Sequence, residues 1–384
     1  MLKKKITILA VAAILLIVGI TASTAQTSIV DSMQFQGEAL ALSLEEALAQ
    51  VVEQSPTVAQ QKISIEQAKV EYQKNMRALD RVKDRFGHHS ETSLVYLENI
   101  HLPQLSNDFA KQNPKWQLEE TIASLIVDVE KSYFELLHAK EMQSINKENL
   151  RIAKDLQEQT KKKYQLGLVA RQQVLNSELN YIRAETDLAA TDAMLTNARM
   201  MFNVTMGYEV MDNIKVHDKL TLKEFKPIGI ADAVQSAFDN RIEVKRAAFA
   251  LELEEIALEI VSRRYTPNTD MYKQQDLKVR QAKQTLEMLR KNIEMEVRVN
   301  YNQMLQKQRE IETGRKSVEL AEMAMDLSQI SYETGIAQIV ELEQAQLQLQ
   351  QSKLGLSSAI LDYNMAVLNF DKSIGRLAMP YTTE

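Results

Sequence analysis

Large apolar residues recur every seven positions along two stretches of the chain, each followed three positions later by a small residue. The first stretch has Val174, Tyr181, Leu188, Leu195 and Phe202. The second has Leu342, Leu349, Leu356, Tyr363 and Phe370. A strict seven-residue period predicts left-handed supercoiling, and the small residues let a neighbouring helix lie close. A plain antiparallel coiled coil is the alternative, although it would use larger residues at both seam positions.

The two stretches are copies of one unit. The residues from Tyr164 to Gly207 reappear 168 positions later, from Tyr332 to Gly375. The segments that open the copies, residues 44–48 and 230–234, are instead offset by 186. The second copy is therefore 18 residues shorter, and the difference lies between residues 242 and 297. Internal duplication of this size points to a tandem of two similar structural units.

Sparse glycine and proline predict a few very long helices. Ser43 is a suitable N-cap for a short helix that ends before Pro56. Residues 116–164 contain neither proline nor glycine, which predicts a helix of roughly 70 Å at 1.5 Å per residue. Further helices are expected at residues 57–85, 168–206, 230–264, 271–332 and up to Gly375, with a tight turn at 265–270.

These elements predict an all-α fold made of two tandem repeats of long helical hairpins, with at most a short β-hairpin near residues 87–114. The expected divisions are a signal peptide (1–25), a flexible lead-in (26–42), a first hairpin repeat (43–216), a linker (217–229), a second hairpin repeat (230–376) and a tail (377–384). Three lysines precede a 15-residue apolar run at 6–20, which is short for a bilayer span of about 20 residues. An uncleaved anchor is the alternative, and in both cases the body of the chain is exported.

The composition and the missing motifs exclude several classes of functional site. The chain has no cysteine, so neither a disulfide, a thiol nucleophile nor a thiolate metal site is available. A net charge of -6 without a basic stripe gives no reason to expect nucleic acid. Dinucleotide, phosphate-loop, hydrolase and zinc-protease motifs do not occur. His88, His89, Glu91 and His101 fall in an expected loop without helical ligand spacing, so we predict no metal, cofactor or catalytic site.

Several motifs in fixed order carry a family resemblance. They are the opening Leu44-Glu45-Glu46-Ala47-Leu48 with Ser55-Pro56, the turn Tyr164-Gln165-Leu166-Gly167-Leu168, its copy Tyr332-Glu333-Thr334-Gly335-Ile336, and the closing Gly207 and Gly375. With these motifs the chain resembles the TolC family of outer-membrane efflux proteins over nearly its whole expected mature length. The resemblance implies a homotrimer whose hairpins line a helical tunnel, and a twelve-stranded β-barrel in the outer membrane.

The resemblance also implies a role for each hairpin tip. A periplasmic or extracytoplasmic adaptor would dock there and bring an inner-membrane pump to the tunnel. The expected docking residues are Tyr164, Gly167, Leu168, Tyr332, Gly335 and Ile336. Two tip positions that are often aspartate in the family hold Gln173 and Glu341, which are possible polar positions of the tunnel; for Glu341 we favour a solvated helix face, which needs no function.

The chain departs from the family in length. A membrane β-strand takes roughly 9–11 residues, whereas the expected turn at 265–270 has room for none and residues 87–114 have room for one hairpin at most. We therefore hypothesise a helical tunnel without most or all of the β-barrel insertions, and the outer-membrane location implied by the family is in doubt. The leading interpretation is an export channel component that conducts small molecules or proteins without catalysis. The alternative is an exported coiled-coil scaffold of the cell envelope that conducts nothing.

Overall fold

The computed structural model describes residues 35–86, 88–91 and 93–377, so the expected signal peptide and most of the tail lie outside the described residues. The first repeat comprises strand β1 (Gln36–Leu42), helices α2 (Leu44–Gln54), α3 (Pro56–Phe86) and α4 (Leu94–Tyr96), the π-helical turn η1 (Leu97–His101), helices α5 (Leu102–Gln165) and α6 (Arg171–Thr205), and strand β2 (Asp212–Val216). The second comprises α7 (Ile230–Asn240), α8 (Ile242–Arg264), α9 (Asp270–Glu333) and α10 (Ile339–Ser373).

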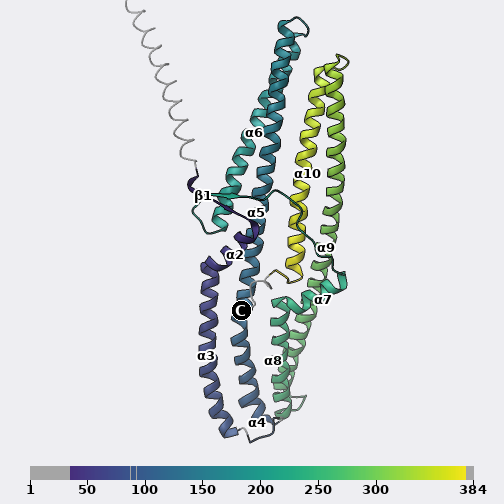
Figure 1. Ribbon diagram of the computed structural model, residues 1–384. Helices are drawn as coiled ribbons and strands as arrows, with labels where there is room; N and C mark the ends of the chain where they lie inside the picture. Colours follow the sequence, from purple (N-terminus) through teal and green to yellow (C-terminus); the bar gives the residue numbers. More distant parts are fainter. Residues whose placement is uncertain (1–34, 87, 92, 378–384) are drawn as a thin grey trace, which may run out of the picture.

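The helix lengths confirm the duplication. Helices α5 and α9 both have 64 residues, and α6 and α10 both have 35. The short helices α2 and α7, which open the repeats, both have 11 residues. The predicted all-α fold of two tandem helical hairpins is confirmed (Figure 1). Within the described ranges, no helix combines the length and the hydrophobicity that a membrane span requires.

The extra residues of the first repeat lengthen its helices instead of forming a β-hairpin. Helix α3 has 31 residues, against 23 in its counterpart α8. On the return, α4 and η1 run directly into α5, whereas α9 starts at the position equivalent to the first residue of α5. Pro114 lies inside α5, so the helix expected to begin at residue 116 begins at Leu102. Pro114 is tolerated within α5 because α3 and α8 pack against this helix on both sides.

The long helices lie side by side in a row. In the upper half of Figure 1 the order of packing is α6, α5, α10, α9, and in the lower half it is α3, α5, α8, α9. Helices α5 and α9 run the whole length of the molecule, while α3 and α6 follow one another along one side of the row. The row therefore has two edges, formed by α3 with α6 and by α9.

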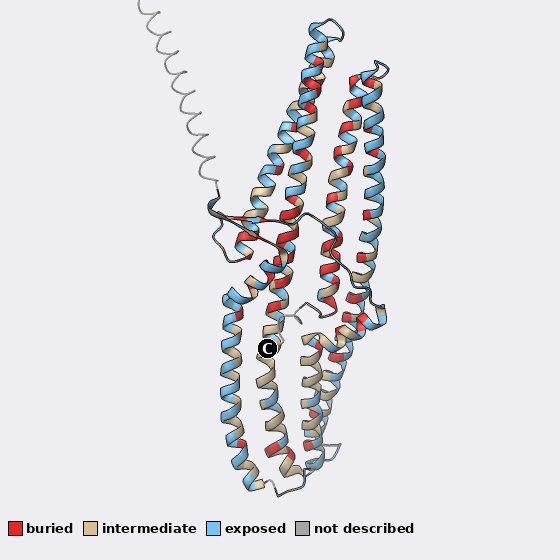
Figure 2. Cartoon of the chain, viewed as in Figure 1, coloured by how far each residue is buried: buried red, intermediate tan, exposed pale blue. Residues whose placement is uncertain are grey.

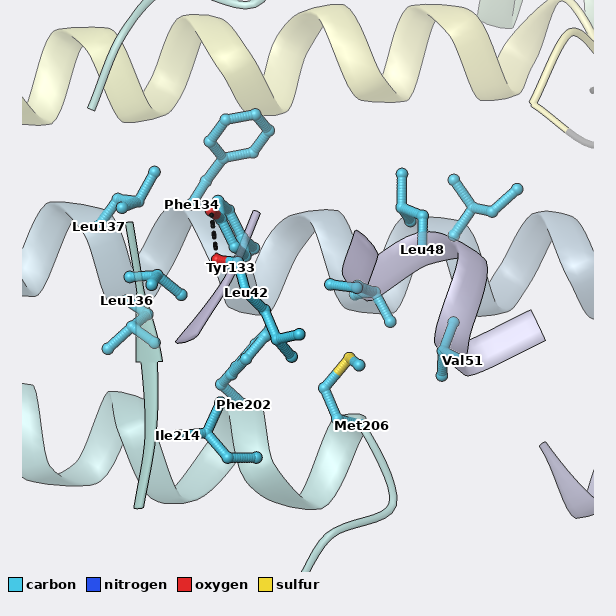
Figure 3. Close-up of a cluster of buried hydrophobic side chains, with 14 of the residues drawn as sticks. Leu42, Leu48, Val51, Tyr133, Phe134, Leu136, Leu137, Phe202, Met206 and Ile214 are labelled. Carbon is cyan, nitrogen blue, oxygen red and sulfur yellow. Dashed lines mark hydrogen bonds between the residues drawn. The ribbon is translucent and has the colours of Figure 1, made fainter. Parts of the chain in front are cut away.

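Two equivalent hydrophobic clusters hold the middle of the molecule. The first joins β1, α2, α5, α6 and β2 around Tyr133 and Phe202 (Figure 3), and the second joins α7, α9 and α10 around Val297 and Phe370. Phe202 and Phe370, the last large residues of the two heptad series, are both fully buried. Buried residues gather at this level, whereas the outer faces of the hairpins are exposed (Figure 2). The heptad pattern therefore pairs α5 with α6 and α9 with α10.

The structure differs from the sequence expectation at residues 36–42, which form β1 instead of part of a flexible lead-in. Strand β1, at the start of the first repeat, pairs in parallel with β2, at the end of that repeat. The hydroxyl of Tyr133 donates to the carbonyl of Leu42 at 3.3 Å and to the carboxylate of Asp218 at 2.6 Å, which fixes the end of the sheet to α5. Such a pairing between distant segments leaves no local signal in the sequence.

Four glycines end the long helices of the hairpins in the same way. Gly167, Gly207, Gly335 and Gly375 all have φ between 73° and 81°, the left-handed region that favours glycine. At each one, two backbone N–H groups return to carbonyls of the last helical turn, as in a Schellman motif. The N-cap expected at Ser43 also forms, and Glu46 completes a capping box with it.

The repeat supplies a matched pair for testing these glycines. A Cβ at Gly375 would lie 2.8 Å from Cβ of Asn240, whereas a Cβ at Gly207 would meet nothing within 4 Å. We expect Gly207→Ala to cost about 1–2 kcal/mol of stability through backbone strain alone. Gly375→Ala should cost about 1–3 kcal/mol more because α7 must also move. Chemical unfolding followed by circular dichroism measures both; equal losses would contradict the close packing of α7 against Gly375.

Candidate functional site

The tip of the first hairpin presents an apolar surface. Tyr164 ends α5 and is half-exposed, and Gly167 turns the chain. Leu166 and Leu168 on either side of this glycine are 74% and 69% exposed. Because the backbone hydrogen bonds of the turn involve only its own residues, these side chains are held outward by a rigid turn.

The tip of the second hairpin has the same backbone turn with different side-chain burial. Ile336 is 83% exposed, as expected for a docking residue, and Gly335 has φ 79°. Tyr332, the counterpart of Tyr164, is buried, and the ammonium of Lys163 lies 3.8 Å from the centre of its ring. A cation–π contact at Tyr332 therefore connects the two tips, and the side chain of this expected docking residue is covered in the single chain.

The two polar tip positions lie in the first turns of α6 and α10. Gln173 is half-buried and Glu341 is exposed. Their backbone N–H groups donate to the carbonyls of Ala170 and Gln338 at 3.0 and 3.1 Å. The repeat thus places the two side chains equivalently within their own hairpins.

A seam of polar residues joins the two hairpins along α5 and α10. The imidazole Nδ1 of His138 lies 2.9 Å from the hydroxyl of Ser357. Further toward the tips, the amide of Gln350 donates to Asn146 Oδ1 at 2.8 Å, and that of Gln346 donates to Asn149 Oδ1 at 2.8 Å. Burial lowers the pKa of His138, so the neutral imidazole is favoured in this seam.

Near the tips the same seam contains buried polar atoms that form no hydrogen bond with the described residues. Oε1 of Glu343 and Oε1 of Gln346 are both buried without a hydrogen-bond partner there. Burial also raises the pKa of Glu343, because desolvation penalises its charged form. Close to the tips the two hairpins are also joined by a buried apolar cluster, formed by Leu156, Met325, Tyr332, Ile339 and Leu342. The two unpaired oxygens therefore lie in an otherwise packed contact, where each lost hydrogen bond is costly.

A strap formed by residues 217–229 crosses this seam at the middle of the molecule. Lys223 forms a buried ion pair with Glu130 of α5, and its backbone N–H donates to Asn364 of α10 at 2.8 Å. Asn364 in turn donates to the carbonyl of Thr221 at 2.8 Å. The nearby carboxyl of Asp371 has a raised pKa, chiefly because it is buried. The strap thus fastens both hairpins to one another.

A groove of about 570 Å³ follows the seam beside the strap. Its walls include Ile145 and Leu349, and charged residues such as Glu141 and Lys219 also line it. In the histidine cluster that was expected to be an ordinary loop, the rings of His88 and His89 are in contact with centroids 4.3 Å apart, whereas His101 ends the π-helical turn η1. In the described ranges no group of three or more histidine, aspartate or glutamate side chains could hold a metal ion. The candidate functional features of the described chain are therefore the surfaces between its helices and not a metal site.

Sequence reasoning missed the polar seam and the strap. The signal was present in a comparison of the copies: Gln346, Gln350 and Ser357 of α10 stand where α6 has Glu178, Ile182 and Ala189. Two hairpins with the same heptads but different side chains at these positions have different neighbours. Tyr332 was expected at a docking tip, and only the packing of the tips shows that it is covered.

Comparison with known proteins agrees with this geometry. Residues 266–376 match the family model described as outer membrane efflux protein. Among curated protein sequences, none matches the chain. The fold is similar to that of the outer-membrane channel OprN (12% identity, 86% of this chain and 89% of that chain covered, TM-score 0.68). It is also similar to the CmeC outer membrane channel of Campylobacter jejuni (11% identity, 87% and 85%, TM-score 0.67) and to the outer membrane protein VceC of Vibrio cholerae (10% identity, 86% and 96%, TM-score 0.67).

These comparisons confirm the predicted resemblance to the TolC family of outer-membrane efflux proteins. The family model covers α9, α10 and the turns at their ends. The solved channels share the fold over most of the chain at 10–12% identity, which extends the likeness of the fold to both repeats.

The half-buried carboxyl of Glu343 gives a test of this seam. Its counterpart in the first hairpin is Leu175, so Glu343→Leu restores the residue of the other copy. We expect this variant to be about 1 kcal/mol more stable than the parent at pH 7, because a half-buried carboxylate with one buried, unpaired oxygen is removed. Thermal unfolding at several pH values measures the effect.

The pH dependence follows from the raised pKa of Glu343. The parent protein gains stability as the pH falls through this raised pKa toward the ordinary value of 4.5, because the carboxyl becomes neutral. The advantage of the variant should therefore shrink near pH 4. Glu341→Leu, which removes an exposed carboxylate from the same helix, is the control and should give no gain. A gain independent of pH would show that the carboxyl of Glu343 is not the cause.

Proposed function

We propose that this chain is a subunit of an efflux or export channel in the cell envelope, and that three copies close into a helical tunnel. The observation that carries this proposal is the open row of helices, whose two edges have no partner within the described chain. In this role the chain conducts small molecules or proteins and carries out no catalysis. The similarity of the fold to outer-membrane channels supports the proposal.

The exposed edges have the chemistry of an interface. Helix α6 exposes Leu175, Leu179 and Ile182, and α9 exposes Leu320 and Leu327, each between 48% and 67%. Contiguous apolar surface of this kind marks sites of protein association. The two edges differ from one another, so contact between them is head-to-tail and produces a closed ring or an open filament.

The dimensions suit a conduit. Helices α5 and α9 have 64 residues each, which gives a length of about 96 Å at 1.5 Å per residue. A ring of such helices encloses a passage along the whole molecule. The expected signal peptide of residues 1–25 supports export of the mature chain beyond the cytoplasmic membrane.

The tips are the proposed docking site for an adaptor that connects the channel to an inner-membrane pump. Leu168 and Ile336 are equivalent residues of the two hairpins, and both are largely exposed. The rigid glycine turns present them without a loss of loop entropy on binding. Gln173 and Glu341 lie just behind these turns, where they would face the passage or the surrounding water.

An exported scaffold protein that conducts nothing is the second candidate. It would require the exposed edges to pair symmetrically or to remain single. The unlike edges favour the ring, because symmetric pairing of one edge would leave the apolar surface of the other uncovered.

Assembly distinguishes the two candidates directly. We expect native mass measurement of the mature chain to give three copies, and electron microscopy to show a central passage. Leu327→Asp should reduce assembly at least about tenfold, because it places a charge in the apolar edge. Gln329→Asp, an exposed polar position of the same helix, is the control. A monomer or a two-fold dimer would favour the scaffold.

Export activity tests the docking tips. Ile336→Asp should raise retention of a fluorescent efflux substrate in cells that depend on this channel, because a charged tip no longer buries its apolar contact with the adaptor. The variant should still form the native assembly. Met271→Asp makes a similar change at an exposed residue near the opposite end of the molecule and should export normally. Unchanged export by Ile336→Asp would exclude this tip from docking.

A further inference from the structure

A cavity of about 610 Å³ lies on the C-terminal half of α6, next to β2. Three of the residues that line it are charged, namely Asp192 and Arg199 of α6 and Lys215 of β2. Phe35, which precedes β1, and Leu195 of α6 add apolar surface. The cavity therefore combines an excess of positive charge with an aromatic and an aliphatic wall.

The guanidinium of Arg199 has no acidic partner in the part of the chain that the structure describes. Its Nε is buried there without a hydrogen-bond partner, and its Cζ lies 4.6 Å from the centre of the ring of Phe35. The carboxylate that lines the same cavity, Asp192, instead accepts a hydrogen bond from the amide of Gln143 at 2.7 Å. Burial lowers the pKa of Arg199, because desolvation penalises the charged form of its side chain.

Elsewhere the chain neutralises a partly buried arginine with its own carboxylates. Arg241 forms ion pairs with Glu243 at 2.9 Å and with Glu296 at 2.7 Å. An arginine that is removed from water without such partners loses hydration that no hydrogen bond replaces. Arg199 is therefore a cation at the wall of a cavity whose hydrogen-bonding capacity the described chain does not use.

The duplication shows that packing does not require a cation at this place. The offset of 168 relates Arg199 to Val367 of α10, which is fully buried in the second hydrophobic cluster. One turn earlier, Asn364 donates to the carbonyl of Thr221 in the strap at 2.8 Å. At the offset of 186 that relates the openings of the repeats, Phe35 is the counterpart of Thr221. Both repeats thus place a chain segment across the same part of the helix, but the first has a cation where the second has a core valine.

We propose that this cavity binds a carboxylate, with the guanidinium of Arg199 as its main anchor and Lys215 as a second cation. A planar guanidinium matches a carboxylate through two parallel hydrogen bonds. A singly charged group balances the two cations and Asp192, whereas a phosphate group, with a charge of about -1.5 to -2, would leave negative charge in the cavity. The apolar wall of Phe35 and Leu195 suits the carbon skeleton of the ligand. This site does not depend on the proposed passage or on docking at the tips.

Two sources can supply this carboxylate. One is Asp31, the only charged residue between Lys5 and Glu38. It lies outside the described residues and precedes Phe35 by four positions, a reach of up to about 14 Å for an extended chain. The other source is a free small molecule that carries a carboxylate and an apolar group. The two compete for the same guanidinium, and a group on the same chain benefits from a high effective concentration.

Fluorescence titration with dansylglycine tests the site, because this probe joins an aromatic ring system to a carboxylate. Dansylamide, which lacks the carboxylate, is the matched control probe. We expect the mature full chain or its Asp31→Asn variant to bind dansylglycine at least about tenfold more tightly than dansylamide. In the chain that binds, Arg199→Gln and Arg199→Val should abolish this preference, and the second of these restores the residue of the other copy. Arg183→Gln, which changes an exposed arginine of the same helix, should retain it.

The comparison of the parent with Asp31→Asn distinguishes the two sources. Tighter binding of dansylglycine by Asp31→Asn than by the parent would identify Asp31 as the natural ligand, whereas equal binding would identify a free carboxylate. The proposal is overturned if neither chain prefers dansylglycine to dansylamide. It is also overturned if either variant of Arg199 keeps the preference while circular dichroism shows the native helix content. Neither result would affect the proposed channel, which does not use this cavity.

Discussion

The structure depends on one constraint: its long helices lie in a single row, so that each packs against its neighbours in the row and not against a second layer of long helices. In the described chain, α6, α5, α10 and α9 form a row in which each inner helix has two neighbours and each outer helix has one. A globular domain would bury such helices under a second layer. Here the faces of the described row carry short elements, namely the two-stranded sheet, α2, α7 and the strap, so the edges of the row retain apolar surface that a single chain cannot bury.

The middle of the molecule converts two separate hairpins into one unit. The hydrophobic clusters around Phe202 and Phe370 hold each repeat together, and the ion pair of Lys223 with Glu130 connects the strap to α5. A buried ion pair adds little net stability compared with an apolar pair, but losing one partner leaves a costly unpaired charge. The strap therefore fixes the position of the hairpins more than it stabilises them.

The sequence predicted features that depend on local patterns and duplication. The seven-residue period identified the paired helices, and the four glycines marked their ends because only glycine adopts the required φ without strain. Residues 36–42 and Pro114 were misjudged because tertiary contacts decided both: a distant strand completes β1, and neighbouring helices hold α5 through the proline. The candidate site was predicted only at its tips. Tyr332 is buried in a cluster with Leu156 of the other hairpin and contacts Lys163, which depends on how two hairpins approach one another and is encoded by no single helix.

The polar seam within the chain and the proposed contact between copies differ in chemistry because they are formed in different ways. Contact between α5 and α10 is intramolecular, because the chain and its strap already bring the hairpins together, so a polar seam with an unpaired Glu343 is sufficient. Contact between copies must first overcome about 4–15 kcal/mol of lost translational and rotational freedom. Apolar residues such as Leu175 and Leu320 supply that free energy most directly, since their burial is favourable without exact hydrogen-bond geometry.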